Sequence, residues 1–285
     1  MNITGHTRLF GIVARPIRHS FSPMMHNRAF DVLGLDNIYL AFEIEDNDLA
    51  SAIQGFRALG VQGANISMPF KQAIIPYLDE LDISAKLCNA VNTIVLKDNK
   101  YIGYSSDGYG FMESLRDQGI DLVDKKLMVA GSGGAALAII AQASLDKVGE
   151  IIIYKRRVEE QAFIDQIKVI QDYTNAHIEI KNIEDQESLK QDLVSTTVFV
   201  NATSVGMAPN SDASIILDSS YFHKGLCVVD IIYNPLETKL LKQAKQAGAK
   251  TMNGKPMLLF QGARAFELFT GQKMPIEEIK KLMEI

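Results

Sequence analysis

The sequence contains few cysteines, no long apolar run and no extended block of basic residues. Its two cysteines, Cys88 and Cys227, lie far apart without the spacing of metal ligands, which favours a reduced, cytoplasmic protein over a disulfide framework. The apolar runs are too short to span a membrane, and the N-terminus shows no signal-peptide pattern. The five histidines form no HxxH or HExxH pattern, so we predict no metal site.

The charge and the length restrict the class of protein further. A net charge of −5 argues against a nucleic-acid-binding surface. The 47% hydrophobic and 22% charged residues are typical of a globular chain, and 285 residues suggest two domains. These values favour neither nucleic acid nor a membrane as a partner, and we expect a monomer or homodimer that binds a small-molecule substrate.

Predicted strands and helices alternate along most of the chain, which indicates an α/β fold with parallel sheets and helices on both faces. In the first part we expect strands at 8–14, 39–44 and 61–67, a hairpin at 92–96 and 100–104, and helices at 46–59, 71–78 and 107–118. In the second part we expect strands at 126–130, 150–154, 177–181, 198–201, 226–231 and 250–252. The helices there are expected at 134–145, 158–173, 186–193, 238–247, 257–270 and 275–283.

The segment HSFSP places two serines directly before an amphipathic helix that ends near Gly34. Pro23 suits the first turn of a helix, which makes Ser22 the expected N-cap. Ser20 is then left without a structural explanation. Because free N–H groups at a helix N-terminus favour anions, the two hydroxyls also suit a carboxylate or phosphate, and both interpretations stay open.

A glycine-rich loop follows the strand expected at 126–130 and opens the next helix. Gly131, Gly133 and Ala136 fit the pattern G-x-G-x-x-G/A. One glycine makes the tight turn, the second lets backbone approach a pyrophosphate, and the third small residue lets helix and strand pack closely. The strand–loop–helix context favours dinucleotide binding over a structural turn.

Basic residues stand where the second strand of such a domain ends. An acidic residue usually binds the ribose 2′-hydroxyl of NAD there, whereas this chain has Lys155, Arg156 and Arg157. Guanidinium groups can bind a 2′-phosphate in a bidentate manner, so the pattern favours NADP over NAD. Glu159 and Glu160 follow closely, so NAD stays an alternative cofactor.

Lys71 and Asp107 are candidates for acid–base chemistry. The segment NISMPFK ends in Lys71, and Asp107 follows the hairpin, so both lie near strand ends, where ligands bind in open α/β sheets. Brought together, a lysine and a carboxylate can move a proton at a substrate hydroxyl. Two alternative interpretations stay open: the two residues form a structural ion pair, or Asp107 caps a helix. Gln261 is polar within the apolar segment MLLFQGA and needs a partner or a ligand.

Together these motifs resemble the shikimate dehydrogenase family. The chain carries HSFSP, NISMPFK, NAVNT, GYSSDG, GSGGA, NATSVGM, DIIYNP and NGKPMLLFQGA in the order of that family, across nearly its whole length. Several segments look most similar to the quinate/shikimate dehydrogenase branch, which accepts either cyclic acid. The resemblance implies an N-terminal α/β substrate domain at 1–108, with 253–285 packing back on it. It implies a Rossmann-type, doubly wound dinucleotide-binding domain at 109–252 and a site in the cleft between the two.

The resemblance also implies a role for each matched residue. Lys71 and Asp107 would form the catalytic pair. The substrate carboxylate would be bound by Ser20 and Ser22, and the ring hydroxyls by Tyr39, Ser67, Asn92 and Gln261. The dinucleotide would be lined by Gly131, Ser132, Gly133, Gly134, Ala135, Lys155, Arg156, Arg157, Val158, Ser204, Ile231, Ile232, Tyr233, Asn234 and Gly254.

Three motifs depart from the family pattern. Ser105 and Ser106 replace the usual Asn-Thr before the aspartate, which predicts weaker support for that carboxylate. Ser67 stands where dedicated shikimate enzymes commonly carry threonine, which leaves more room for the extra hydroxyl of quinate. Val158 replaces an aspartate linked to NAD use, so the cofactor stays open between NADP and NAD.

The implied function is hydride transfer between a nicotinamide cofactor and a ring hydroxyl of shikimate or quinate, within the shikimate pathway of aromatic amino acid biosynthesis. The ketone partners would be 3-dehydroshikimate and 3-dehydroquinate. Two alternatives stay open. One is a dehydrogenase for an aminoshikimate-like acid. The other, from a different class, is a non-catalytic dinucleotide sensor, which would not need Lys71, Asp107 and the paired serines together.

Overall fold

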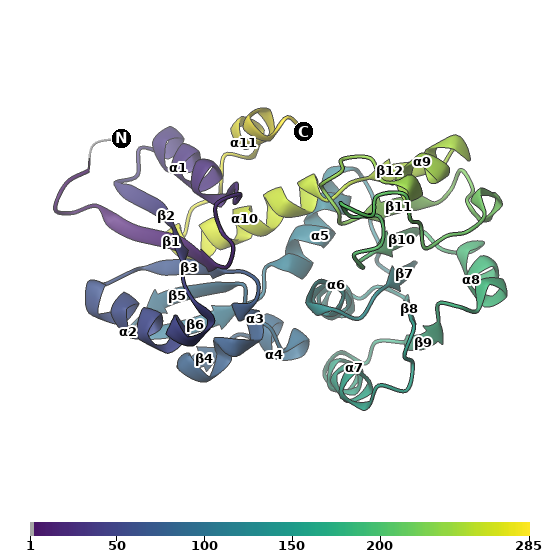
Figure 1. Cartoon of the computed structure of the whole chain (residues 1–285), viewed down its shortest axis with the longest axis horizontal. Coiled ribbons are helices and arrows are strands. Elements are labelled where there is room, and N and C mark those ends of the chain that lie inside the picture. Colours follow the sequence, from purple (N-terminus) through teal and green to yellow (C-terminus); the bar gives the residue numbers. More distant parts are fainter. Residues whose placement is uncertain (1–2) are drawn as a thin grey trace. The chain divides into compact units, whose positions relative to one another are not determined.

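The chain forms two compact units, each with its own six-stranded sheet. The computed structural model describes residues 3–285 (Figure 1). Unit 1 comprises the chain up to Gly110 together with Leu259–Ile285, and unit 2 is Phe111–Leu258. The helices α5 (Asp107–Asp117) and α10 (Lys255–Thr270) each contain residues of both units.

The sheet of unit 1 is mixed, with the strand order β2-β1-β3-β5-β6-β4. Its strands are β1 (Arg8–Ala14), β2 (Asn37–Glu43), β3 (Gly63–Ile66), β4 (Glu80–Leu81), β5 (Thr93–Lys97) and β6 (Lys100–Tyr104). β1 pairs in parallel with β2 and β3, whereas β5 runs antiparallel to both β3 and β6. The predicted hairpin is confirmed, and it makes this sheet mixed instead of wholly parallel.

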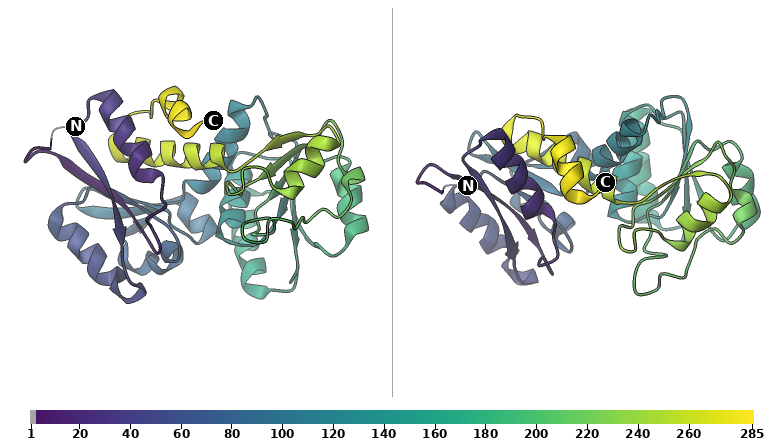
Figure 2. Two further views of the ribbon diagram at one scale, coloured as in Figure 1. Left: turned by 45° about the horizontal axis from the view of Figure 1, so that its top comes forward. Right: turned by 90° about the horizontal axis from the view of Figure 1, so that it is seen from above.

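Helices cover both faces of the unit 1 sheet (Figures 1 and 2). They are α1 (Ser22–Leu33), α2 (Leu49–Leu59), α3 (Phe70–Ala73), α4 (Ile83–Cys88), α10 and α11 (Ile276–Met283). On one face, Val13 of β1 shares a buried cluster with Phe56 of α2. On the other, the Phe10 ring centroid lies 5.6 Å from that of Phe30 in α1 and 5.2 Å from that of Phe269 in α10. Alternate side chains of β1 therefore build the two halves of the core.

Two helical segments of unit 1 contain shorter α-helices than predicted. The segment expected at 71–78 divides into α3 and a 3₁₀ turn, Ile75–Tyr77, because Pro76 has no N–H to continue an α-helix. The segment expected at 46–59 begins with a 3₁₀ turn, Asp46–Asp48, before α2. The sequence did not predict α4, which Asp82 caps by accepting a hydrogen bond from the Ser84 N–H over 2.9 Å.

The sheet of unit 2 is wholly parallel, with the order β12-β11-β10-β7-β8-β9. Its strands are β7 (Lys126–Ala130), β8 (Glu150–Lys155), β9 (Ile178–Asn182), β10 (Val198–Asn201), β11 (Cys227–Asp230) and β12 (Lys250–Met252). Its helices are α6 (Gly134–Leu145), α7 (Gln161–Thr174), α8 (Gln186–Leu193) and α9 (Lys239–Gln246). Counted within the unit, this is the 3-2-1-4-5-6 order of a Rossmann-type sheet, so the predicted fold class is confirmed.

Helices also cover both faces of the unit 2 sheet (Figure 1). Leu189 of α8 and Leu241 of α9 share a buried cluster with Met128 and Val228 of the strands. The helices α6 and α7 lie on the opposite face. The strand order reverses between β7 and β10, and open α/β sheets bind ligands at such a point. Within residues 3–285, no helix is long and apolar enough to cross a membrane.

Candidate active site

The lysine and the aspartate that we predicted as a pair meet in unit 1. Lys71 lies in α3, shortly after β3, and Asp107 is the first residue of α5. The Lys71 Nζ donates a hydrogen bond to Asp107 Oδ2 over 2.6 Å. The two side chains are 29% and 14% exposed. The pair is therefore partly buried yet still accessible to a ligand.

Asn92 orients the carboxylate of this pair. Its Nδ2 donates to Asp107 Oδ1 over 2.7 Å, and its Oδ1 accepts from the Ser106 N–H over 2.8 Å. Its Nδ2 also donates to Ser106 Oγ over 3.0 Å. These bonds fix the direction in which the Asn92 amide faces. Ser106 thus supports Asp107 through Asn92.

A buried hydrogen-bond network extends from Asn92 to Tyr39. Asn65 Nδ2 donates to the Asn92 carbonyl over 3.2 Å and to Thr93 Oγ1 over 3.1 Å. The Tyr39 hydroxyl donates to Asn65 Oδ1 over 2.6 Å. Burial raises the pKa of Tyr39 well above its ordinary value, and hydrogen bonds with Ser22 and Asn65 only partly oppose this rise. Tyr39 is therefore a neutral donor that holds Asn65, a residue to which sequence reasoning assigned no role.

The two serines of HSFSP lie at the start of α1, but their structural roles differ from the prediction. The helix begins at Ser22 itself, and Phe21 occupies the N-cap position without a side-chain hydrogen bond. The Ser22 N–H donates to Ser20 Oγ over 3.3 Å. The predicted cap at Ser22 is wrong because Ser20 satisfies the backbone there, while Ser22 forms a hydrogen bond with Tyr39. Pro23 lies in the first helical turn, as predicted.

Ser67 and Gln261 belong to the same unit as the lysine–aspartate pair. Ser67 is partly buried and directly follows β3. It lies four residues before Lys71 in the chain. Gln261 lies in α10, next to Gly262, where a Cβ would overlap the Met25 methyl group of α1. The absence of a side chain at Gly262 therefore lets α10 approach α1 closely.

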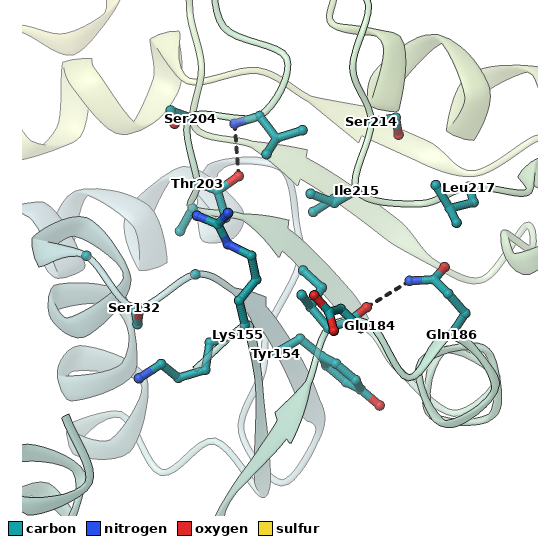
Figure 3. Close-up of a pocket in the computed structure, with 16 residues that line it drawn as sticks. Ser132, Tyr154, Lys155, Glu184, Gln186, Thr203, Ser204, Ser214, Ile215 and Leu217 are labelled. Carbon is teal, nitrogen blue, oxygen red and sulfur yellow. Dashed lines mark hydrogen bonds between the residues drawn. The ribbon is translucent and has the colours of Figure 1, made fainter. Parts of the chain in front are cut away.

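Unit 2 has a pocket of ≈ 700 Å³ at the carboxyl ends of its strands (Figure 3). It is lined by the loops after β7, β8, β9 and β10 and by the segment 214–217. The lining residues are Gly131, Ser132, Gly133, Tyr154, Lys155, Arg156, Ile183, Glu184, Gln186, Ala202, Thr203, Ser204, Val205, Ser214, Ile215 and Leu217. Six of the predicted cofactor residues are therefore brought together here.

The glycine loop has the geometry that a pyrophosphate needs. Gly131 has φ +125°, and a Cβ there would lie 2.7 Å from the Ala202 carbonyl oxygen. A Cβ at Gly133 or Gly134 would meet nothing within 4 Å, so the space in front of α6 is open. The N-terminus of this helix has no side-chain cap. Since uncapped N–H groups at a helix start favour phosphate, these residues fit a dinucleotide.

The basic residues after β8 have different environments. Lys155 is only 4% exposed, and its Nζ donates to Glu160 Oε2 over 2.9 Å. The same Nζ lies 4.0 Å from the centroid of the Phe163 ring. Arg156 and Arg157 are exposed, and Arg156 lines the pocket. The charge of Lys155 is thus already paired within the chain, whereas the exposed Arg156 and Arg157 suit a 2′-phosphate.

The other predicted cofactor residues do not line this pocket. Gly134, Ala135, Arg157 and Val158 follow the glycine loop and β8, and Ile231, Ile232, Tyr233, Asn234 and Gly254 belong to the segments after β11 and β12. A Cβ at Gly254 would overlap the Ile231 carbonyl, and the Gly254 N–H donates to the Ile232 carbonyl over 3.0 Å. The segments after β11 and β12 therefore pack directly against each other.

Sequence reasoning missed several residues of the pocket. Glu184 and Gln186 lie just after β9, and both line the pocket (Figure 3). The rule that ligands bind at the carboxyl ends of parallel strands points to them as well. Ile215 and Leu217 belong to an irregular segment, which carries no periodic pattern that predicts its position.

A second polar cluster lies at the start of β8 and β9. Glu150, His177 and Glu179 offer atoms within 4.8 Å of one another that could bind a metal ion. Lys126 Nζ lies 3.4 Å from Glu150, and Lys181 Nζ lies 3.4 Å from Glu179. Lysines therefore already compensate both carboxylates, and the cluster is far from the pocket in the sheet, at the opposite strand ends.

A parallel sheet in this order, with a glycine loop and a pocket at its carboxyl edge, defines a protein with a dinucleotide-binding domain. Sequence comparison identifies the family. Residues 12–94 match the shikimate dehydrogenase substrate binding domain, and residues 256–284 match the shikimate 5′-dehydrogenase C-terminal domain. The chain is 46% identical to the shikimate dehydrogenase (NADP(+)) of Streptococcus uberis, with 99% of this chain and 97% of that protein covered. The chain belongs to the shikimate dehydrogenase family.

Solved structures agree with this assignment. A shikimate 5-dehydrogenase from Listeria monocytogenes, in complex with shikimate and NAD, is 43% identical with a TM-score of 0.95, covering 99% of this chain and 98% of that one. A quinate dehydrogenase from Corynebacterium glutamicum, in complex with NAD, is 25% identical with a TM-score of 0.86, covering 98% and 99%. The predicted family and two-domain α/β fold are thereby confirmed.

Proposed function

We propose that this chain transfers hydride between a nicotinamide cofactor and a ring hydroxyl of shikimate or quinate, with Lys71 as the acid–base group. The main support is the hydrogen bond from Lys71 to one carboxylate oxygen of Asp107. The second oxygen of Asp107 accepts a hydrogen bond from Asn92. A relative that covers the full chain is a shikimate dehydrogenase (NADP(+)), so the protein is an oxidoreductase.

Lys71 carries the proton in this proposal. In the oxidation direction its neutral amine accepts the proton of the substrate hydroxyl, and in reduction its ammonium group donates a proton to the developing alkoxide. Asp107 uses one oxygen for Lys71 and the other for Asn92, so it positions the amine and compensates its charge. The nicotinamide, when bound, supplies the hydride acceptor or donor at the same carbon.

The other predicted site residues of unit 1 bind and orient the substrate in this proposal. We assign its carboxylate to Ser20 and Ser22, at the start of α1, and its ring hydroxyls to Tyr39, Ser67, Asn92 and Gln261. A serine at position 67 leaves room for the extra hydroxyl of quinate, and a quinate dehydrogenase is among the similar structures. Activity with both acids is therefore part of the proposal.

Unit 2 binds the dinucleotide. The open glycine loop suits the pyrophosphate, and Arg156 suits the 2′-phosphate of NADP. We assign substrate binding to 1–108 with 253–285 and cofactor binding to 109–252, which the unit limits at Gly110 and Leu258 support. A cytoplasmic location and a monomeric or homodimeric state complete the proposal.

Replacement of Lys71 tests the acid–base assignment. We expect Lys71→Ala to lower kcat by roughly 10²–10⁴-fold, the usual contribution of a general acid or base. The Kd for NADPH should change little, because unit 2 binds the cofactor. Lys97→Ala, at an exposed lysine of the same unit, is the matched control. Near-normal turnover of Lys71→Ala would contradict the assignment.

A further inference from the structure

Asn201 and Asp230 end two neighbouring strands of unit 2 and contact each other. The register of β10 and β11 pairs these two residues directly. Both side chains are fully buried, and Asn201 Nδ2 donates to Asp230 Oδ1 over 3.1 Å. The loops that leave the two strands therefore begin from one hydrogen-bonded pair.

Asp230 holds the loop after β11 at two points. Its Oδ1 accepts from the Ile232 N–H over 3.2 Å, and its Oδ2 accepts from Thr238 Oγ1 over 2.7 Å. Thr238 also caps α9, because its Oγ1 accepts from the Leu241 N–H over 3.4 Å. One carboxylate thus fixes the start and the end of the segment 231–238, which contains the residues 231–234 that we assign to the cofactor.

Asn201 holds the loop after β10 in the same way. Its Oδ1 accepts from the Thr203 N–H over 3.0 Å and from Thr203 Oγ1 over 2.7 Å, and its Nδ2 donates to the Val205 carbonyl over 3.0 Å. Thr203 Oγ1 in turn accepts from the Val205 N–H over 3.0 Å (Figure 3). Thr203, Ser204 and Val205 all line the pocket. The side chain of Asn201 therefore determines the shape of one pocket wall.

This cluster places a carboxylate where burial opposes its charge. Burial raises the pKa of Asp230, while hydrogen bonds from Thr238, Ile232 and Asn201 lower it. These three donors are all uncharged groups. Because uncharged donors offset the cost of burying a carboxylate only in part, stability alone is a poor reason for this arrangement. What the carboxylate provides is a fixed geometry for two loops at once.

We infer that Asp230, Asn201 and Thr238 are positioning residues for the dinucleotide. They hold the loops after β10 and β11 in the conformation that binds it, and so set the affinity for the cofactor without contact with the substrate. The inference rests on the proposed function and deepens it. It assigns a role to three buried residues, none of which lines the pocket or belongs to the lysine–aspartate site.

A set of threonine variants tests this role. Thr238→Val removes the hydroxyl but keeps the shape, Thr238→Ser restores the hydroxyl, and Thr196→Val is the matched control. Thr196 is also buried in unit 2, but its Oγ1 donates over 2.7 Å to the Asp192 carbonyl, outside the two loops. The chain has no tryptophan, so the Kd for NADPH is measured from the fluorescence of NADPH itself. The KM for shikimate and the Tm are measured alongside.

We expect Thr238→Val to raise the Kd for NADPH about tenfold, the effect of losing one hydrogen bond to a charged group, with the KM for shikimate within about twofold of wild type. Thr238→Ser should bind nearly as tightly as wild type. Thr196→Val should keep the wild-type Kd even if its Tm falls.

Two results would overturn the positioning role alone. One is a Kd for NADPH in Thr238→Val that equals the wild-type value. The other is an equal rise of this Kd in Thr196→Val, which would mean that the weaker binding only reflects lower stability. If the wild-type chain fails to bind NADPH at all, the proposed function fails and the positioning role fails with it. Binding of NADPH by the wild-type chain therefore distinguishes the two failures.

Discussion

Lys155 is a buried cation whose charge contacts both a carboxylate and an aromatic ring. Glu160 accepts its hydrogen bond over 2.9 Å, and the Phe163 ring lies 4.0 Å away. The lysine in turn lowers the pKa of Glu160. Since the stem of Lys155 lines the pocket, its ammonium group is close to the cofactor site but is compensated by another residue. A phosphate bound in the pocket would compete with Glu160 for this charge.

Neutralising Glu160 should shift the cofactor preference towards NADP. In Glu160→Gln the ammonium group of Lys155 loses its anionic partner and becomes available to a 2′-phosphate. We expect the ratio of kcat/KM for NADP to kcat/KM for NAD to rise roughly two- to fivefold, the effect of one partly exposed charge pair. Glu159→Gln is the matched control, because Glu159 is exposed and adjacent. An unchanged ratio in Glu160→Gln would show that Lys155 has no part in the preference.

His26 is a buried histidine in the aromatic part of unit 1. Its ring stacks on Tyr39 at 4.3 Å between centroids, and within residues 3–285 neither ring nitrogen has a hydrogen-bond partner. Burial lowers the pKa of His26 to about 3. Between about pH 6.5 and pH 3 the unfolded chain therefore binds a proton that the folded chain does not. Stability from this residue is full above that window and is lost as the pH falls through it.

Replacing His26 by phenylalanine should remove this acid sensitivity. The ring keeps its aromatic neighbours in His26→Phe, but no proton is taken up on unfolding. On going from pH 7 to pH 4.5 we expect the wild type to lose about 2–3 kcal/mol more unfolding free energy than the variant, from 1.36 kcal/mol for each unit of pH. Urea unfolding at the two pH values measures this difference. Equal losses in the two proteins would contradict the buried, neutral state of His26.

At the scale of elements, β3 packs without room for any side chain at Gly63. A Cβ there would lie 2.6 Å from Phe269 Cδ1 of α10 and 2.8 Å from the Ile94 carbonyl oxygen of β5. In the same unit, a Cβ at Gly55 of α2 would meet nothing within 4 Å. Packing therefore requires a glycine at position 63, whereas nothing in the surroundings of Gly55 excludes a side chain.

Alanine substitutions at these glycines should change stability in opposite directions. Gly63→Ala should lower the free energy of unfolding by about 1–3 kcal/mol, because a β-strand backbone and an aromatic ring must move. Gly55→Ala should raise it by roughly 0.5–1 kcal/mol, because alanine loses less entropy in a helix. Urea unfolding of both variants tests this contrast, and a change of the same sign in both would contradict the packing of β3.

Element positions could be predicted where a continuous apolar run is bounded by turn residues. β1, β7, β10 and α6 have the bounds expected from such runs. β12 and α8 also have their predicted bounds, although α8 consists mainly of polar residues and β12 has only three residues. β4 has only two residues, too few to show a period. The start of α1 shifted because Ser20, and not Ser22, accepts the backbone hydrogen bond, a choice that depends on where Tyr39 lies in the fold.

At the scale of the whole molecule, the order of motifs predicted the fold class and the family. Apart from Lys71 with Asp107, it could not predict which side chains pair across elements. The contact of Lys155 with Glu160, the pair of Asn201 with Asp230, and the isolation of His26 all arise from tertiary packing. A sequence gives the charges and the strand ends at such positions, but only the folded chain decides which of them meet.

The central claim is that this chain is a shikimate dehydrogenase by activity as well as by family. The most direct measurement is a set of initial rates with purified protein, pairing shikimate or quinate with NADP or NAD and following the absorbance of the reduced nicotinamide. We predict turnover of shikimate with NADP, with NAD slower because of Arg156 and Arg157. Faster turnover of quinate with NAD would contradict the cofactor assignment. No turnover in any of the four combinations, despite binding of the cofactor, would contradict the central claim and favour a dinucleotide sensor.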